Sequence, residues 1–365
     1  MILHRYFARK FLLTYLAILS VFFVLIAMVD LVEQVQRYAK RDLAFIDLLG
    51  LTLLNVPEGL YNVMPLVMIL ATVAMFLGLA RNSELVVTRA AGRSALNSLV
   101  APLIVAALIG GLAVTMMNPI VAATSKRYHA LSTAYRTGSR DALSISAEGL
   151  WLRQGGPEGQ TVIRAARANP DGTILFDVTF LSYAVDGGPI RRINAKAAQL
   201  DGGAWQLQGA RIWPLGAGTN PQEGATDRDQ MRIPTTLTQE RIQDSFGKPN
   251  AIQFWDLPGY IAQLRAAGFS ARRHAVWYHM EMARPLFLMA MVLLGAAFTM
   301  RHIRFARTGV SVLSAILLGF GLYYVRNFAQ VLGENGQIPV VLAAWAPSVA
   351  AVLLATGLVL HMEDG

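Results

Sequence analysis

The sequence of 365 residues contains no cysteine. Disulfide bonds, thiolate-bound metal ions and a cysteine nucleophile are therefore excluded. The G-x-x-x-x-G-K-[ST] phosphate-binding loop is also missing. Its nearest match, GKPN at Gly247, has neither the leading glycine nor the hydroxyl residue. Any ATP hydrolysis that serves this protein must therefore come from another chain.

Hydrolase motifs are missing as well. The sequence has no H-E-x-x-H pair and no G-x-S-x-G elbow, and its six histidines are scattered. We therefore expect no catalytic residue and no metal site, and the protein is not predicted to be an enzyme.

Charge is scarce, at 15% of residues against about 25% in a typical soluble domain. Long apolar runs take its place, and a run of roughly 17–25 apolar residues can cross a bilayer as a helix. The first run could be a signal peptide, but it is about twice as long as a typical h-region, and Asp30 follows it instead of a cleavage site. We interpret it as a retained first membrane helix. The six predicted spans are 11–29, 60–80, 95–124, about 275–300, 308–325 and about 338–362.

Positive charges of the short loops are distributed unevenly. An even number of spans puts both termini on one side, and positively charged short loops stay in the cytoplasm. We therefore expect cytoplasmic termini and an external segment 125–273. The terminal side carries Arg5, Arg9, Lys10, Arg81, Arg89, Arg93, Arg301, Arg304 and Arg307, whereas the short loops opposite carry only Arg37, Lys40 and Arg41.

Segment 125–273 is predicted to be an all-β domain inserted between the third and fourth spans. Short strand-like runs alternate with turn signals such as NPDG and DGGP. One run, ILFDVTFLSYAV, places a stripe of apolar residues on one face. That stripe either fills a closed core or lines a path that stays open along one side. Its members are Ile174, Phe176, Val178 and Phe180.

A helical period returns near the end of this domain. In the run DLPGYIAQLRAAG, residues 256–268, Leu257, Ile261 and Leu264 fall on one stripe. We predict a short helical stalk that leads into the fourth span.

A polar stretch, ARNSELVVTRAAGRS at 80–94, separates two apolar runs that carry no charge. At about 100° per residue, most of its small and apolar residues fall on one arc and its charged residues on the rest, with Leu85 the exception. This pattern predicts a short amphipathic helix. It is either a solvated turn whose arginines meet anionic lipid head groups or a helix that docks on a soluble partner.

SELVVTRAAGRS resembles the cytoplasmic coupling helix of the LptF/LptG family, the permease subunits of the ABC transporter that extracts lipopolysaccharide from the inner membrane. Asn118 and Pro119 at the predicted end of the third span, EMARPLF in the fourth, and GQIPVVLAAWAP before the last are similar to family segments. Between the two branches, ELVVTRAAG and VDLVEQVQRY resemble LptG more than LptF.

The resemblance implies an α-helical, multi-pass inner-membrane protein of a Gram-negative bacterium. Three helices with a coupling helix (1–124), a periplasmic jellyroll-like β domain (125–273) and three more helices (274–365) would follow one another. Expected partners are the sibling permease LptF, two copies of the ATPase LptB, LptC, membrane lipids and the substrate lipopolysaccharide, but no nucleic acid. This chain would need no cofactor, because the ATPase uses ATP and Mg²⁺. The residues expected to couple to the ATPase are Glu84, Leu85, Arg89 and Gly92, with Glu84 at the family's acidic position.

Ionisable groups within spans cost at least ~2.5–3.5 kcal/mol each on insertion scales. Glu281 and Arg284 lie at i and i+3 in the fourth span and can pair. The pair is either structural, facing the helix bundle, or functional.

Four cations near the membrane surface are candidates for binding the phosphates of lipid A, because Arg offers phosphate a bidentate fork. Arg326 could instead snorkel to the interface, and the other three could belong to an ordinary solvated loop. The four are Arg37, Lys40, Arg41 and Arg326.

Together these features predict a non-enzymatic permease half. Its spans would form, with a partner's, an outward cavity for lipopolysaccharide, and closure driven through 80–94 would expel the lipid toward the β domain and a bridge to the outer membrane. Two alternatives stay open. One is another ABC transmembrane subunit that acts by mechanotransmission, and the other is a membrane-anchored periplasmic scaffold or sensor.

Overall fold

The computed structural model divides the chain into a helical unit and a β unit, each described here by itself. The helical unit is Met1–Tyr135, Asn250–Trp255 and Arg272–Gly365, and the β unit is Arg136–Pro249 and Asp256–Ala271. The structure describes residues 2–39, 43–90, 95–137, 144–146, 149–156, 159–169, 172–184, 188–215, 222–235, 237–238, 242, 249–266, 270–300 and 308–364.

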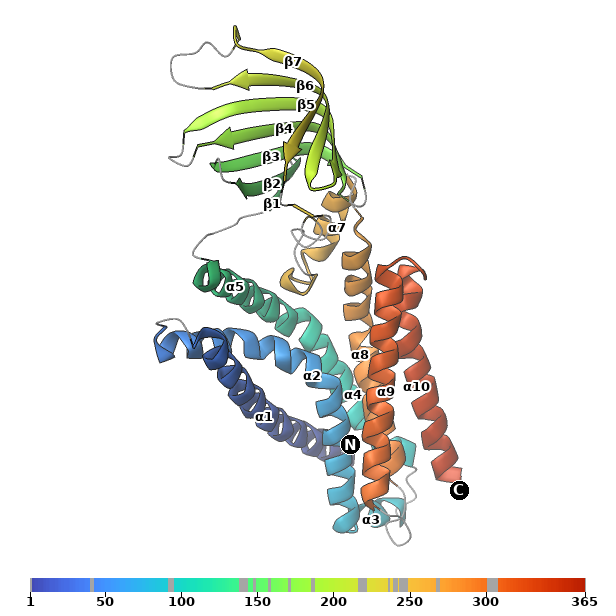
Figure 1. Ribbon diagram of the computed structural model, residues 1–365. Helices are drawn as coiled ribbons and strands as arrows, with labels where there is room; N and C mark the ends of the chain where they lie inside the picture. The colour runs from blue at the N-terminus through green and yellow to red at the C-terminus, as the bar shows by residue number, and fades with distance from the viewer. Residues whose placement is uncertain are drawn as a thin grey trace. The chain divides into compact units, whose positions relative to one another are not determined.

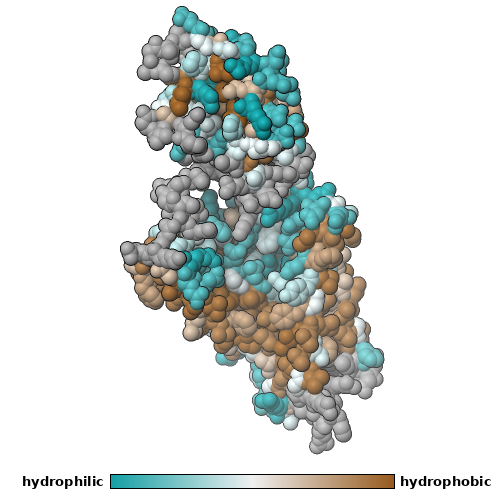
Figure 2. Space-filling model, viewed as in Figure 1, coloured by the Kyte–Doolittle hydropathy of each residue, from teal (hydrophilic) through white to brown (hydrophobic). Residues whose placement is uncertain are grey.

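Among the described residues, six long apolar helices confirm the six predicted spans (Figure 1). The third span is built from α4, a π-helical turn η1 and α5, and a short helix, α3, lies between α2 and α4. Figure 2 shows a continuous hydrophobic surface over the long helices. The helices are α1 (Ile2–Tyr38), α2 (Phe45–Arg81), α3 (Glu84–Ala90), α4 (Ala95–Leu112), η1 (Ala113–Met117), α5 (Asn118–Thr137), α8 (Arg272–Thr299), α9 (Thr308–Glu334) and α10 (Val340–Asp364).

The helix α8 is the centre of the helical unit. Its apolar window is 72% buried, against 6% for α1 and 17% for α9, and it packs against α2, α4, α9 and α10. The close approach of α4 to α8 depends on a small residue. A Cβ atom on Gly110 of α4 would come within 2.5 Å of the Cα of Pro285 on α8, so no larger residue fits there without a shift.

The third span does not end at Asn118 and Pro119, as the sequence predicted. Pro119 has no N–H for the carbonyl of Thr115, four residues earlier, and its ring crowds that carbonyl. The helix widens into the π turn η1 and then continues as α5 to Thr137. The boundary between the two units falls after Tyr135, eleven residues beyond the expected last residue, 124.

In the described part of the β unit, seven strands form one antiparallel sheet and follow chain order. This arrangement confirms the inserted β domain, and the helix α7 (Leu257–Ala266) buries the predicted stripe Leu257, Ile261 and Leu264. Figure 1 shows a strongly curved sheet. The strands are β1 (Ser144–Ser146), β2 (Gly149–Gly156), β3 (Gly159–Ala168), β4 (Ile174–Tyr183), β5 (Pro189–Asp201), β6 (Ala204–Pro214) and β7 (Thr226–Pro234).

A crease crosses four strands of this sheet. On β4, Phe180, Val178 and Leu175 are buried, so the inward positions change parity between Val178 and Leu175. The same change occurs on β3, β5 and β6 at positions that pair across the sheet. Backbone angles mark the line, with φ of 53° at Asp177 and 61° at Gly209. A sheet that turns a corner needs such local breaks.

The crease overturns the predicted alternation on β4. Val178 and Phe180 face the core, where Phe180 packs edge-on against the buried Trp205. Phe176 lies outside, 38% exposed and beside the guanidinium of Arg167, and Leu175 takes the inward place. Ile174 is half-buried. The strict period of two fails because Asp177 adopts a left-handed backbone conformation.

Candidate functional site

Glu281 and Arg284 form a buried ion pair on α8. Two guanidinium nitrogens of Arg284 donate to the carboxylate at 2.6 and 3.1 Å, and Glu281 is fully buried. The hydroxyl of Tyr61, on α2, also donates to this carboxylate. Through the Tyr61 hydroxyl, the buried pair therefore ties α2 to α8.

Pro65 explains the second contact of Arg284. Because proline has no N–H, the carbonyl of Tyr61, four residues earlier, loses its helical donor. The Nη1 atom of Arg284 donates to that carbonyl at 3.2 Å, and its guanidinium lies 3.8 Å from the centre of the Tyr61 ring. A residue that the sequence analysis missed, Tyr61, is thus the main partner of the pair. Pro65 in an apolar run is the signal that could have indicated it.

Arg326 lies inside the helical unit, 6% exposed, on α9. Its Nη2 donates to the carbonyl of Met280 at 3.3 Å, and its guanidinium lies 5.2 Å from the ring centre of Phe287. Its Nε atom is buried, and no hydrogen-bond partner for it lies within the described part of the chain. Among the residues that the structure describes, no carboxylate forms an ion pair with it.

Two adjoining cavities between α2, α8 and α9 form a groove with unlike ends. The polar cavity, of about 200 Å³, contains Arg284 and Arg326. The apolar cavity, of about 130 Å³, continues from it, and the two share Asn62, Pro65 and Tyr323. Trp277, Asn327 and Gln330 complete the polar end, and Val63, Leu66, Ile69, Met291, Gly319 and Phe320 complete the apolar end.

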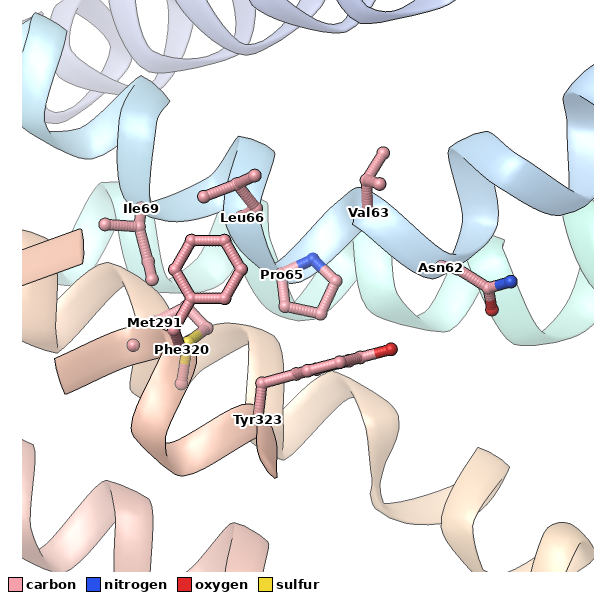
Figure 3. Close-up of a pocket in the computed structure, with 9 residues that line it drawn as sticks. Asn62, Val63, Pro65, Leu66, Ile69, Met291, Phe320 and Tyr323 are labelled. Atoms are coloured by element: carbon pink, nitrogen blue, oxygen red, sulfur yellow. The ribbon is translucent and has the colours of Figure 1, made fainter. Parts of the chain in front are cut away.

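Figure 3 shows the apolar end of this groove. The rings of Phe320 and Tyr323 face α2, and the hydroxyl of Tyr323 points toward the Asn62 end. A cationic compartment that opens into an apolar one fits a ligand with an anionic head and a hydrocarbon tail. We refer to these two cavities together as the amphipathic groove.

The short helix α3 lies at the other candidate site. Ser83, with a φ of 57°, reverses the chain after α2. Leu85 and Thr88, which lie outside the predicted apolar arc, are buried, whereas Val87, which lies on that arc, is exposed. The buried face of α3 is therefore not the predicted one, and Leu85 packs in the core of the helical unit. Nothing is described of the Arg89 side chain, and Gly92 lies outside the described residues.

Glu84 faces α1. Its carboxylate accepts from Lys10 at 2.9 and 3.2 Å and from the Tyr6 hydroxyl at 2.7 Å. Partial burial raises the pKa of Glu84, but the hydrogen bonds from Lys10, Tyr6 and Asn82 and the charge of Lys10 outweigh burial and hold this pKa below its ordinary value. Glu84 is therefore charged at neutral pH.

Arg37 donates to Tyr128 at 3.0 Å and pairs with Glu33 one turn away. These two partners engage the guanidinium nitrogens Nη1 and Nη2 of Arg37. Lys40 and Arg41, grouped with it by the sequence, lie outside the described residues. A buried network that the sequence analysis did not predict is centred on Asp30, about two turns earlier on α1. In it, Asp30 accepts from Asn55 at 2.6 Å and lies close to Gln34.

A strap of residues 250–255, which belongs to the helical unit, contacts the third span and α8. The indole Nε1 of Trp255 donates to the carbonyl of Thr115 at 3.3 Å, the acceptor that Pro119 leaves free. The side-chain oxygen of Asn118 accepts from the Phe254 amide at 2.8 Å, and the Phe254 ring stacks on Tyr278. Asn118 and Pro119 thus form a docking point for this strap.

Comparison with known proteins gives consistent matches across the chain. The family model described as lipopolysaccharide export system permease LptF/LptG matches residues 5–361. The chain is 24% identical to the lipopolysaccharide export system permease protein LptG of Haemophilus influenzae, over 99% of both chains. It is 23% identical to the LptG protein of Escherichia coli strain K12, over 99% of this chain and 98% of the relative.

Proposed function

Because this chain belongs to the LptF/LptG family of lipopolysaccharide export permeases, we propose that it is the LptG-type half of the permease that extracts lipopolysaccharide from the inner membrane. The termini lie in the cytoplasm and the β unit in the periplasm. A second permease, LptF, completes the membrane cavity. LptB, in two copies, supplies ATP hydrolysis, and LptC receives the lipid together with the β unit.

The amphipathic groove is the observation that carries this proposal. Lipopolysaccharide joins phosphates on a sugar head to several acyl chains, and the groove joins Arg284 and Arg326 to an apolar wall. The groove is small, so it holds one phosphate and the start of one chain, while the rest of the lipid lies in the larger cavity shared with the partner.

Arg326 is the residue that binds the phosphate. A buried cation without a carboxylate partner is costly, and a bound anion removes that cost. Arg284 is already neutralised by Glu281, so it shapes the cavity and adds little charge. The unpartnered Nε of Arg326 supplies a donor for a phosphate oxygen.

The β unit would carry the lipid onward. Val178 and Phe180 would contribute to the inner wall of its curved sheet, because they face the core. Phe176 faces outward and would not.

The test is ATP-driven release of lipopolysaccharide from a reconstituted complex. The chain is purified with its partners from a Gram-negative host, and lipid A is quantified before and after ATP addition. Arg326→Met should lower retained lipopolysaccharide by about tenfold, the size of one charge-assisted contact. Arg326→Lys should retain an intermediate amount. Arg9→Met, at an exposed cation on α1, is the control.

Two outcomes contradict the proposal. A wild-type complex that hydrolyses ATP but holds and releases no lipopolysaccharide would favour mechanotransmission. A chain that co-purifies with no ATPase would favour a scaffold or sensor.

A further inference from the structure

The first helix is fixed to the short helix α3 by a closed cluster of three side chains. Lys10 contacts both carboxylate oxygens of Glu84, at 2.9 and 3.2 Å, and the hydroxyl of Tyr6 at 3.0 Å. Tyr6 in turn contacts Glu84 at 2.7 Å. Both oxygens of the carboxylate are thus engaged by α1, so Glu84 is not simply presented to a partner.

The helix α1 is buried at its two ends. Phe7, Phe11 and Tyr15 are buried near the cluster and Asp30, Gln34 and Tyr38 near the other end, whereas the middle of the helix is mostly exposed. The contacts near the cluster therefore fix one of the two ends of α1. A charge-assisted cluster at this end joins the helix to α3, because charged donors and acceptors make the stronger hydrogen bonds.

We infer that Lys10 and Tyr6 are positioning residues that connect α1 to α3, so that a displacement of α3 moves α1. This inference rests on the proposed function, in which an ATP-hydrolysing partner displaces α3. Glu84 then serves as the attachment point of α1 within the chain, a role separate from any contact that its partly exposed side chain makes with that partner. The surface left for the partner includes Val87, which is exposed.

A charge swap separates these two roles of Glu84. Lys10→Glu and Glu84→Lys should each reduce ATP-driven lipopolysaccharide release by about tenfold, the size expected for a charge-assisted contact. The double variant Lys10→Glu/Glu84→Lys should recover most of the wild-type rate, because it restores the ion pair with its partners exchanged. Arg9→Glu, which makes the same charge change on the neighbouring exposed residue, should have little effect.

Cysteine cross-linking tests the contact between α1 and α3 without a transport assay. The chain has no cysteine, so Lys10→Cys/Glu84→Cys offers the only two thiols of the chain to a short bis-thiol reagent. We expect rapid cross-linking in the purified complex, and slow cross-linking for Arg9→Cys/Glu84→Cys. If cross-linking is rapid but the wild-type complex releases no lipopolysaccharide, the contact stands and the proposed function fails.

The inference is overturned by either of two results. A double variant as defective as Glu84→Lys alone, with the ATPase still attached, would show that Glu84 acts outside this cluster. Equal cross-linking of the Lys10 and Arg9 pairs would show that α1 is not fixed to α3 at this point. Tyr6→Phe, which removes one hydrogen bond and no charge, should give a smaller loss of release than Lys10→Glu, and a larger loss would contradict the ion pair as the main link.

Discussion

Arg284 donates to the backbone carbonyl of Tyr61 at 3.2 Å, and this acceptor is free because Pro65 has no N–H to give it. The same arrangement occurs at Pro119, where the indole of Trp255 donates to the free carbonyl of Thr115. In both places a proline inside a membrane helix frees a carbonyl, and a side chain from another segment satisfies it. Such carbonyls need a donor in lipid, so the prolines fix where neighbouring segments dock.

Arg284→Met should destabilise the protein strongly, by about 3–5 kcal/mol, because it leaves the charge of Glu281 buried and unpaired. The double variant Glu281→Met/Arg284→Met should cost less than the single one, since it removes both charges. Thermal unfolding of the purified protein in one detergent measures both. A double variant less stable than Arg284→Met would contradict this account of the pair.

Trp255→Phe should cost about 1 kcal/mol, because the carbonyl of Thr115 loses its donor. Pro119→Ala supplies a backbone N–H that can replace the indole. The cost of Trp255→Phe should therefore be smaller in the Pro119→Ala background, which a double-mutant cycle of unfolding measurements detects. Equal costs in the two backgrounds would show that the indole contact does not depend on the missing N–H.

Asp177→Val should destabilise the β unit by about 1–2 kcal/mol, because a β-branched residue tolerates a φ of 53° poorly. Asp177→Gly should be neutral or stabilising, since glycine has no such penalty. Thr179→Val, two residues along β4 at a regular position, is the control and should change stability little. Hydrogen exchange of β3, β4 and β5 in the full chain reports the local effect. Equal loss of protection in Asp177→Val and Thr179→Val would argue against the crease.

The contact of Glu84 with α1 should not depend on pH near neutrality. Its pKa lies below the ordinary carboxyl value, so the contribution to stability is present above the ordinary pKa of about 4.3 and is lost only as pH falls through the lowered folded value. Protection of α3 from hydrogen exchange, corrected for intrinsic rates, should be constant from about pH 6 to pH 8. Glu84→Gln should lower that protection at every pH. A protection that rises with pH in this range would assign Glu84 a pKa near neutrality and contradict the contact.

The six spans could be predicted because long uncharged runs are a property of composition alone. The ends of the helices could not be predicted in this way. In α1, for example, the charged residues beyond the apolar run remain helical, and Arg37 pairs with Glu33 one turn away. By local sequence, Asn118 and Pro119 resemble the end of a helix. The helix continues instead, and Phe254 and Trp255 of the strap form hydrogen bonds with Asn118 and with the carbonyl of Thr115, which has no helical donor.

The candidate sites were predictable only in part. Spacing alone indicates that Glu281 and Arg284 can pair, because i and i+3 share a helix face. The contact between Lys10 and Glu84 joins residues 74 positions apart, and no local pattern encodes it. The parity change at Asp177 is a property of the folded sheet, so the alternation of apolar residues on β4 gave the wrong face for Phe176.

Photocrosslinking in the amphipathic groove tests the central claim most directly. A photoreactive amino acid replaces Phe320, 42% exposed at the apolar end of the groove, or Leu354, 43% exposed on α10 outside it. After irradiation of the nucleotide-free complex in membranes, adducts are identified with an antibody to lipopolysaccharide. We predict a lipopolysaccharide adduct at Phe320 that is lost when ATP hydrolysis is trapped with vanadate, and none at Leu354. No adduct at Phe320, or equal adducts at both positions, would contradict the claim that this groove takes the substrate.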